Sequence, residues 1–345
     1  MIMKIKLTAI LLSITALLFS QTGNSSFNFL SLPTGARQEA FGGSNISIYD
    51  NDLNFAFTNP ALLSTETHNI LGVNYTNLFN DVNIASAIYG RNFGEKNFTA
   101  YGFHYIDYGS FTETSITNEV LGKFTAKDMT ITAIYGRWLS PRWSAGIALK
   151  TVCSVYEQYS SWGMAADIGF SYHNEKALFS AGLVLRNAGI QFNSYSPLND
   201  NSRRMLPIDL QIGISQKLPK APIRFSLTLH NLQTWDLSAA VSDNTEDRMA
   251  EKSKAQRGAD MFFRHTIWSV EILPMKNFYI VASYNHRRRM DMSVQSKRSV
   301  AGFSFGAGLT VKNKISVGFS VVPYQSGSLG YNVTISTNLK AFGVK

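Results

Sequence analysis

From about residue 69 onward, apolar and polar positions alternate with a period of two along most of the chain. The clearest run is residues 301–311, where Ala, Phe, Leu and Val alternate with Gly, Ser and Thr. This period predicts β-strands, because successive side chains of a strand point to opposite faces. The pattern predicts fourteen strands, which begin near Asn69, Asp81, Lys96, Met129, Trp143, Met164, Leu178, Ile208, Arg224, His265, Phe278, Val300, Ile315 and Leu329.

The connections between these strands alternate between short and long. Short connections are expected at 93–96, 140–142, 174–176, 218–221, 274–277 and 312–314, and long ones at 109–128, 188–207, 232–264 and 286–299. Short periplasmic turns and long extracellular loops are typical of an outer-membrane barrel. An even number of strands then places both termini on the periplasmic side. A soluble antiparallel sandwich is the alternative, but it gives no reason for loop length to alternate.

Residues 143–150, WSAGIALK, indicate what the two faces of a strand contact. Trp143, Ile147 and Leu149 fall on one face, and small or polar residues fall mostly on the other. In hydrocarbon an open sheet edge leaves costly unpaired backbone groups, so a sheet there must close. We therefore expect the aliphatic face to contact lipid and the other face to line the lumen. Trp138 and Trp143 are expected at the membrane interface.

The composition and the N-terminus predict an exported chain. Only 16% of the residues are charged, against roughly 25% in ordinary soluble domains. Lys4 and Lys6 precede an apolar run at residues 7–19, so residues 1–20 predict a signal peptide cleaved after Ser20. A buried N-terminal helix is the alternative. No later run has the length of a membrane helix, and Cys153, the only cysteine, is interpreted as a small apolar strand residue.

Residues 21–68 lack the alternation. Pro33, Gly35, Gly42, Gly43 and Pro60 interrupt this segment, so we expect neither a strand nor a long helix there. Side chains just fill a barrel of eight strands, so the lumen of a fourteen-stranded barrel is too wide to be filled by its own wall. The sequence thus predicts an all-β fold, a transmembrane antiparallel β-barrel at residues 69–345 with an N-terminal plug at residues 21–68 in its lumen.

The plug segment also carries a family resemblance. Gly42-Gly43, then Asp50 and Asp52, then Asn59-Pro60-Ala61 resembles the N-terminal region of FadL-like fourteen-stranded barrels. More narrowly, residues 29–63 are similar to the PorV/PorQ family of type IX secretion in Bacteroidetes, and most to its PorQ branch. The residues that carry this motif are Pro33, Ala36, Arg37, Gly42, Gly43, Asn59, Pro60 and Ala61. The C-terminus, AFGVK, lacks the terminal aromatic residue common to many outer-membrane barrels.

The resemblance implies a non-enzymatic role in the outer membrane. It implies an anchor for a cell-surface attachment complex that receives secreted proteins and links them to lipopolysaccharide. The implied partners are a PorZ-like surface protein, with PorV and the PorU sortase in one complex. Two alternatives stay open: a FadL-like transporter of hydrophobic small molecules, and a PorV-like carrier of secreted cargo. The small and polar residues expected on the lumen face disfavour the apolar pocket that a transporter needs.

Motifs for catalysis and metal binding are incomplete. Residues 302–306 fit G-x-S-x-G, but Ser304 lies in mid-strand, where a nucleophile elbow needs a sharp turn. Residues 50–54 begin like a calcium loop, but Phe55 and Ala61 occupy the places of the required Gly and Glu. Turn capping explains Asp50 and Asp52 better, and the six histidines lack zinc-ligand spacing. We predict no catalytic, cofactor or metal site and no nucleic-acid partner.

Two long loops are expected to face outward. Arg287, Arg288 and Arg289, with Arg298, form a basic loop that suits phosphate or carboxylate groups of lipopolysaccharide. The alternative is a loop that is only solvated. The longest loop predicts a short helix capped by Thr245 and ending at Gly258, which a partner orders or which frays in solvent.

Overall fold

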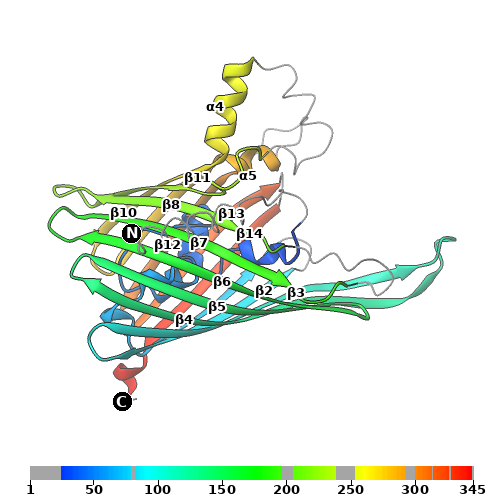
Figure 1. Cartoon of the computed structure of the whole chain (residues 1–345), viewed down its shortest axis with the longest axis horizontal. Helices are drawn as coiled ribbons and strands as arrows, with labels where there is room; N and C mark the ends of the chain where they lie inside the picture. Colours follow the sequence, from blue (N-terminus) through cyan, green and yellow to red (C-terminus); the bar gives the residue numbers. More distant parts are fainter. Residues whose placement is uncertain are drawn as a thin grey trace, which may run out of the picture.

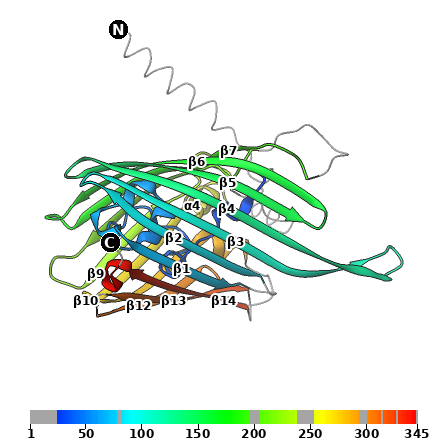
Figure 2. The same ribbon diagram turned by 90° about the horizontal axis from the view of Figure 1, so that it is seen from below.

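The protein forms a closed β-barrel around its own N-terminal segment (Figures 1 and 2). The computed structural model describes residues 25–78, 82–195, 205–237, 253–292, 300–312, 314–325 and 328–343. The fourteen strands pair antiparallel with their neighbours in the chain, and β1 (Ile70–Asn77) closes the barrel against β14 (Ser328–Asn338). The predicted all-β barrel of fourteen strands is confirmed. The predicted signal peptide lies outside the described residues.

Most strands begin within three residues of the predicted positions. Two begin earlier: β4 starts at Val120 instead of near Met129, and β6 starts at Tyr159 instead of near Met164. The other strands are β2 (Asn83–Phe93), β3 (Asn97–Thr114), β4 (Val120–Ser140), β5 (Trp143–Tyr156), β6 (Tyr159–Asn174), β7 (Phe179–Gln191), β8 (Asp209–Lys217), β9 (Ile223–Leu229), β10 (Thr266–Met275), β11 (Phe278–Asn285), β12 (Phe303–Val311) and β13 (Ile315–Gln325).

β3 and β4 continue past the barrel as a two-stranded ribbon. The predicted long loop at 109–128 is therefore wrong: Phe111 pairs with Phe124, and Thr114 pairs with Val120. The β-branched and aromatic residues of this run favour extended backbone. Figure 1 shows the ribbon extending well past the neighbouring strands. Its side chains Phe111, Val120 and Leu121 are exposed.

The two faces of the wall have the predicted character. On β5, Trp143, Ile147 and Leu149 are exposed, whereas Ser144 and Lys150 are buried toward the lumen. Exposed aliphatic and aromatic side chains recur on almost every strand, from Val73 on β1 to Ile335 on β14. Such an apolar outer band is what contact with acyl chains requires.

Trp138 is not at the membrane interface, contrary to the prediction. Its ring packs edge-on against Phe98, with the ring centroids 5.4 Å apart, inside the barrel. The physical reason is the register of β4, where Tyr135 and Arg137 point outward and the intervening positions point inward. Trp143 keeps its exposed position, 52% accessible, next to the short turn at residues 141–142.

The N-terminal segment fills the lumen. It contains η1 (Asn28–Ser31), α2 (Ala36–Ala40), η2 (Leu53–Phe57), η3 (Pro60–Leu62) and η4 (Thr65–Thr67). Figures 1 and 2 show these blue elements enclosed by the strands. Phe41, Ile48 and Phe55 pack with Leu62 and with Val281 of β11 in one buried apolar cluster. Apolar burial against the wall thus holds a segment that has little regular structure of its own.

Two helices lie at one end of the barrel and the C-terminal η5 (Leu339–Phe342) lies at the other (Figure 1). These helices are α4 (Lys254–Arg264) and α5 (His286–Asp291). The predicted end of the loop helix is wrong. Ser253 caps α4 through a reciprocal pair of hydrogen bonds with Gln256, and Gly258 lies inside the helix, while Thr245 is outside the described residues. None of the described helices has the length and apolar character needed to cross a membrane.

Candidate functional site

Arg37 ties the plug to the barrel wall. Its Nη2 lies 2.7 Å from Asp50 Oδ2 and 2.8 Å from Glu271 Oε1, and its Nη1 lies 3.5 Å from Asp52 Oδ2. Arg224 of β9 completes the cluster, 3.1 Å from Glu271 Oε2 and 3.4 Å from Asp50 Oδ2. Two guanidinium groups and three carboxylates are thus shared between α2, the following loop and two strands.

The charges of this cluster shift the acidities of the plug residues in it. Burial alone would lower the pKa of Arg37, but Asp50 and Glu271 outweigh this and raise it. Burial alone would raise the pKa of Asp50, but Arg37 and Arg224 lower it to about 2. Burial raises the pKa of Asp52 despite the attraction of Arg37. Arg37 and Asp50 are therefore firmly charged at neutral pH, which keeps the plug and the wall bound.

Asp50 and Asp52 also shape the loop, as predicted. Asp50 Oδ1 accepts the backbone N–H of Asp52, and Asp52 Oδ1 accepts that of Asn54, both at 3.1 Å. The second bond caps η2. The same two carboxylates therefore cap the turn with one oxygen and bind Arg37 with the other.

A second ion pair fixes the other side of α2. Arg288 Nη1 lies 3.0 Å from Glu39 Oε1 and donates to Ser304 Oγ at 3.0 Å. The Arg288 guanidinium also lies 5.5 Å from the ring centre of Tyr324. Arg288 thus points into the barrel and does not present its charge to lipopolysaccharide. Ser304, the centre of the G-x-S-x-G match, is a fully buried residue of β12.

Gly42 and Gly43 end α2 where the plug meets the wall. Their φ angles are 81° and 98°, which glycine adopts without steric cost. Gly42 N–H donates to Glu39 O at 3.0 Å, and Gly43 N–H donates to Gln38 O at 3.1 Å. A Cβ on Gly42 would lie 2.6 Å from Cγ2 of Ile267 on β10. At the start of the helix, Ala36 N–H donates to Thr334 Oγ1 of β14 at 2.8 Å.

The Asn59-Pro60-Ala61 motif forms a tight turn against the wall. Asn59 Oδ1 accepts the N–H of Ala61 at 3.0 Å, and Asn59 Nδ2 donates to Ile46 O at 2.9 Å. Three wall positions lack a side chain where this turn approaches, because a Cβ there would overlap the backbone or side chains of the plug. They are Gly146, Gly169 and Gly182. The motif therefore lies in close contact with the backbone of the barrel wall.

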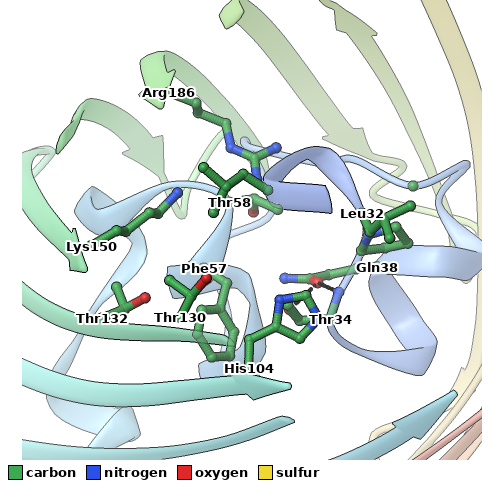
Figure 3. Close-up of a pocket in the computed structure, with 13 residues that line it drawn as sticks. Leu32, Thr34, Gln38, Phe57, Thr58, His104, Thr130, Thr132, Lys150 and Arg186 are labelled. Carbon is green, nitrogen blue, oxygen red and sulfur yellow. Dashed lines mark hydrogen bonds between the residues drawn. The ribbon is translucent and has the colours of Figure 1, made fainter. Parts of the chain in front are cut away.

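A small cavity of about 20 Å³ remains between the plug and the wall (Figure 3). Its lining includes Leu30, Pro33 and Gln38 from the plug and Lys150 and Arg186 from the wall. The volume suits one water molecule, which needs roughly 10–15 Å³ by the same measure. A benzene-sized ligand occupies a cavity on the order of 150 Å³, so this space does not form a path for one.

The wall of this cavity contains a buried ion pair. Lys150 Nζ lies 2.6 Å from Asp167 Oδ2 and donates to Asn187 Oδ1 at 2.8 Å. Asp167 Oδ1 accepts the backbone N–H of Asn187 at 2.7 Å, beside a register shift between Ala166 and Ile168 where β6 pairs with β7. The carboxylate thus replaces part of the strand ladder at this bulge.

At the helical end of the barrel, the predicted basic loop forms a short helix. Arg264 joins α4 to α5, with Nε 3.1 Å from Asp260 Oδ2 and Nη1 3.1 Å from Asp291 Oδ1. Arg287 is paired within α5, with Nε 3.4 Å from Asp291 Oδ2. Arg289 packs beside Gly302, and Arg298 lies outside the described residues.

Several residues of these contacts were not singled out from the sequence. They are Glu39, Asp167, Arg186, Arg224 and Glu271. Three of them share a signal, since Asp167, Arg186 and Glu271 are lone charges at lumen-facing positions of strands without other Asp, Glu, Lys or Arg residues. A charge on the lumen face of a plugged barrel needs a partner, and this rule would have identified them.

Comparison with known proteins supports the fold. No protein-family model matches the chain, and no curated protein matches it. Among solved structures, the Ralstonia pickettii toluene transporter TbuX matches with a TM-score of 0.54 and 11% identity, over 91% of this chain and 100% of its own. The monoaromatic hydrocarbon channel CymD matches with a TM-score of 0.53 and 13% identity, over 90% of this chain and 97% of its own. The Pseudomonas putida toluene transporter TodX matches with a TM-score of 0.51 and 10% identity, over 88% of this chain and 96% of its own. The chain has the fold of FadL-like outer-membrane barrels.

Proposed function

We propose that this chain is an integral outer-membrane protein whose plug closes the lumen and whose long-loop end anchors a surface protein complex. The loops are extracellular and the termini are periplasmic in this proposal. The observation that carries it is the attachment of the plug in the lumen, because ion pairs on two sides of α2 tie it to the wall. In this proposal the barrel moves nothing through its lumen and serves as a membrane anchor. The plug motif resembles that of the PorV/PorQ family, and this family suggests the type IX secretion system as the setting.

The ribbon of β3 and β4 is the surface that we assign to the partner. Among the described residues, its two strands pair only with each other beyond the barrel, and they carry exposed apolar side chains, including Phe111 and Leu121. An isolated two-stranded hairpin is marginally stable in water, and a free strand edge binds extended segments of other chains. A PorZ-like protein, with PorV and the PorU sortase in one complex, is the partner that the family resemblance suggests.

Lipopolysaccharide is the second proposed contact. Arg287 and Arg289 of α5 remain as candidates, because Arg288 is bound to Glu39. Arg298, outside the described residues, stays a candidate from the sequence alone. Guanidinium groups bind phosphate through paired hydrogen bonds. Substituting these three arginines together is expected to reduce binding of lipopolysaccharide vesicles without changing the plug.

Deleting the gene and fractionating the cells tests the main role. The expected result is that surface proteins of the secretion pathway appear in the medium and that the partner leaves the outer membrane. Purification of the intact protein in mild detergent should recover the partner, and a variant without residues 110–125 should not. Unchanged attachment of surface proteins in the deletion strain would contradict the proposal.

A transporter of hydrophobic small molecules is the second candidate. The solved structures favour it more directly than they favour the first, because TbuX, CymD and TodX are named as hydrocarbon transporters or channels. The β6–β7 register shift beside the cavity offers a place for a lateral opening. Uptake of radiolabelled toluene into proteoliposomes would support this candidate, and uptake no faster than in empty liposomes would remove it.

Carriage of secreted cargo, as in PorV, is distinguished from anchoring by the partner. Copurification with the signal domains of secreted cargo proteins would favour carriage, and copurification with a surface protein that is not cargo would favour anchoring.

A further inference from the structure

The cavity between plug and wall has more positive charge than its protein residues balance. Lys150 and Arg186 both line it, and Asp167 is the acid paired with Lys150, at 2.6 Å. Within the described part of the chain, no carboxylate lies within 4.0 Å of the Arg186 guanidinium. The lining therefore carries two cations, and of these only Lys150 has an acidic partner among the described residues.

Arg186 is deeply buried as well as unbalanced. Its side chain belongs to a residue that is 6% exposed, and its Nε has no hydrogen-bond acceptor among the described residues. A guanidinium that is removed from water without a counter-charge is strongly destabilising. Natural proteins pair such a charge, so the position of Arg186 indicates a negative partner that is not part of the described protein.

Other polar atoms around the same space also lack partners. The hydroxyl of Thr130 and the Nε2 of His104 are buried without a hydrogen bond among the described residues. Figure 3 shows Thr130, His104, Lys150 and Arg186 arranged around the cavity. An ammonium has three N–H donors, and two of those on Lys150 are used by Asp167 and Asn187. A donor of Lys150, the donors of Arg186 and the Thr130 hydroxyl are thus available to one acceptor.

We propose that this cavity binds a small monovalent anion of the halide class, held by Lys150, Arg186 and Thr130. A neutral water molecule would fit the space of about 20 Å³ but would leave the charge of Arg186 unbalanced. A cation is excluded by the sign of the lining. Sulfate and phosphate are too large for a space that suits a single water molecule. The anion lies where η1 and α2 face β5 and β7, so it stabilises this side of the plug.

Anomalous diffraction from crystals of the whole protein, folded and purified in sodium bromide, tests the proposal. The expected result is an anomalous bromine peak in the cavity, in contact with Lys150 and Arg186. Density in the cavity without an anomalous signal would show a water molecule and would overturn the proposal, as would an empty cavity. The wild-type map decides this whether or not any variant folds.

Variants identify the residue that selects the anion. Arg186→Gln removes the unbalanced positive charge and leaves Lys150 paired with Asp167, so the bromine peak is expected to disappear. Arg91→Gln is the control, because Arg91 is an exposed arginine of β2 that lies outside the cavity lining, and it should keep the peak. A peak that persists in Arg186→Gln would overturn the assignment. As a second readout, bromide should raise the unfolding temperature of the wild type relative to the larger isethionate anion, and this difference should vanish in Arg186→Gln.

Discussion

Replacing Arg37 with methionine removes the charge that joins the plug to the wall and keeps most of the side-chain volume. The Arg37 side chain is 8% exposed and that of Glu271 is 0% exposed, so solvent screens this pair little. In Arg37→Met, three carboxylates remain with Arg224 alone. Breaking a buried ion pair by removing one partner costs about 3–5 kcal/mol.

This cost falls on the attachment of the plug, since the strand ladders of the barrel do not depend on Arg37. With a tenfold change for each 1.4 kcal/mol, the displaced plug should become about two to three and a half orders of magnitude more populated. Hydrogen exchange of the protein in nanodiscs, read by mass spectrometry, measures this. The amides of α2 should exchange faster by that factor, while those of β5 and β13 should not change.

Arg91→Met is the control, because it removes an exposed arginine near the short-turn end of β2. It should leave the exchange of α2 at the wild-type rate. Equal protection of α2 in Arg37→Met and in the wild type would refute the reasoning, because it would mean that the ion pairs contribute nothing to plug retention.

Three further outcomes are expected. Gly146→Val places a branched side chain against Pro60, and this overpacking should destabilise the docked turn by about 1–3 kcal/mol and speed the amide exchange of residues 59–63. Gly258→Ala, at an open position of α4, should leave that exchange unchanged. Burial opposes the charge of Asp50, but Arg37 and Arg224 lower its pKa to about 2. The stabilisation of the plug by Asp50 should therefore be complete above about pH 4 and be lost as the pH falls toward 2. Protection of the α2 amides, corrected for the intrinsic exchange rate at each pH, should stay constant down to about pH 4, and a loss of protection already at pH 6 would be inconsistent with this. Phe111→Ser combined with Leu121→Ser should abolish retention of the surface partner on an affinity column, whereas Thr112→Ser on the same ribbon should retain it, and full retention by the double variant would remove the ribbon from the interface.

The alternation of the sequence located the barrel strands because each strand has one apolar outer face and one face toward the plug. Where this condition ends, the pattern ends as well. In the outer part of β3, residues Ser110–Thr114 are exposed on both faces, so no alternation exists there and the run resembled a loop. The length of the ribbon was therefore not predictable from periodicity, although its β-branched residues were a weaker indication.

The plug motif singled out Arg37 but did not indicate what it binds. Arg37 and Glu271 are 234 positions apart, and their contact depends on how the closed barrel brings β10 to α2. The buried position of Arg288 was likewise not predictable from the sequence, because a run of arginines suggests a solvated loop. In α5, Arg288 instead points to Glu39 while Arg287 stays beside Asp291, since neighbouring helical residues face different directions.

The central claim, that the plug closes the lumen, is tested most directly by the ionic current through single protein molecules in a planar lipid bilayer. We predict no steady current from the wild-type protein and a large, stable current from a variant that lacks residues 25–68. A steady open-channel current from the wild type would contradict the account.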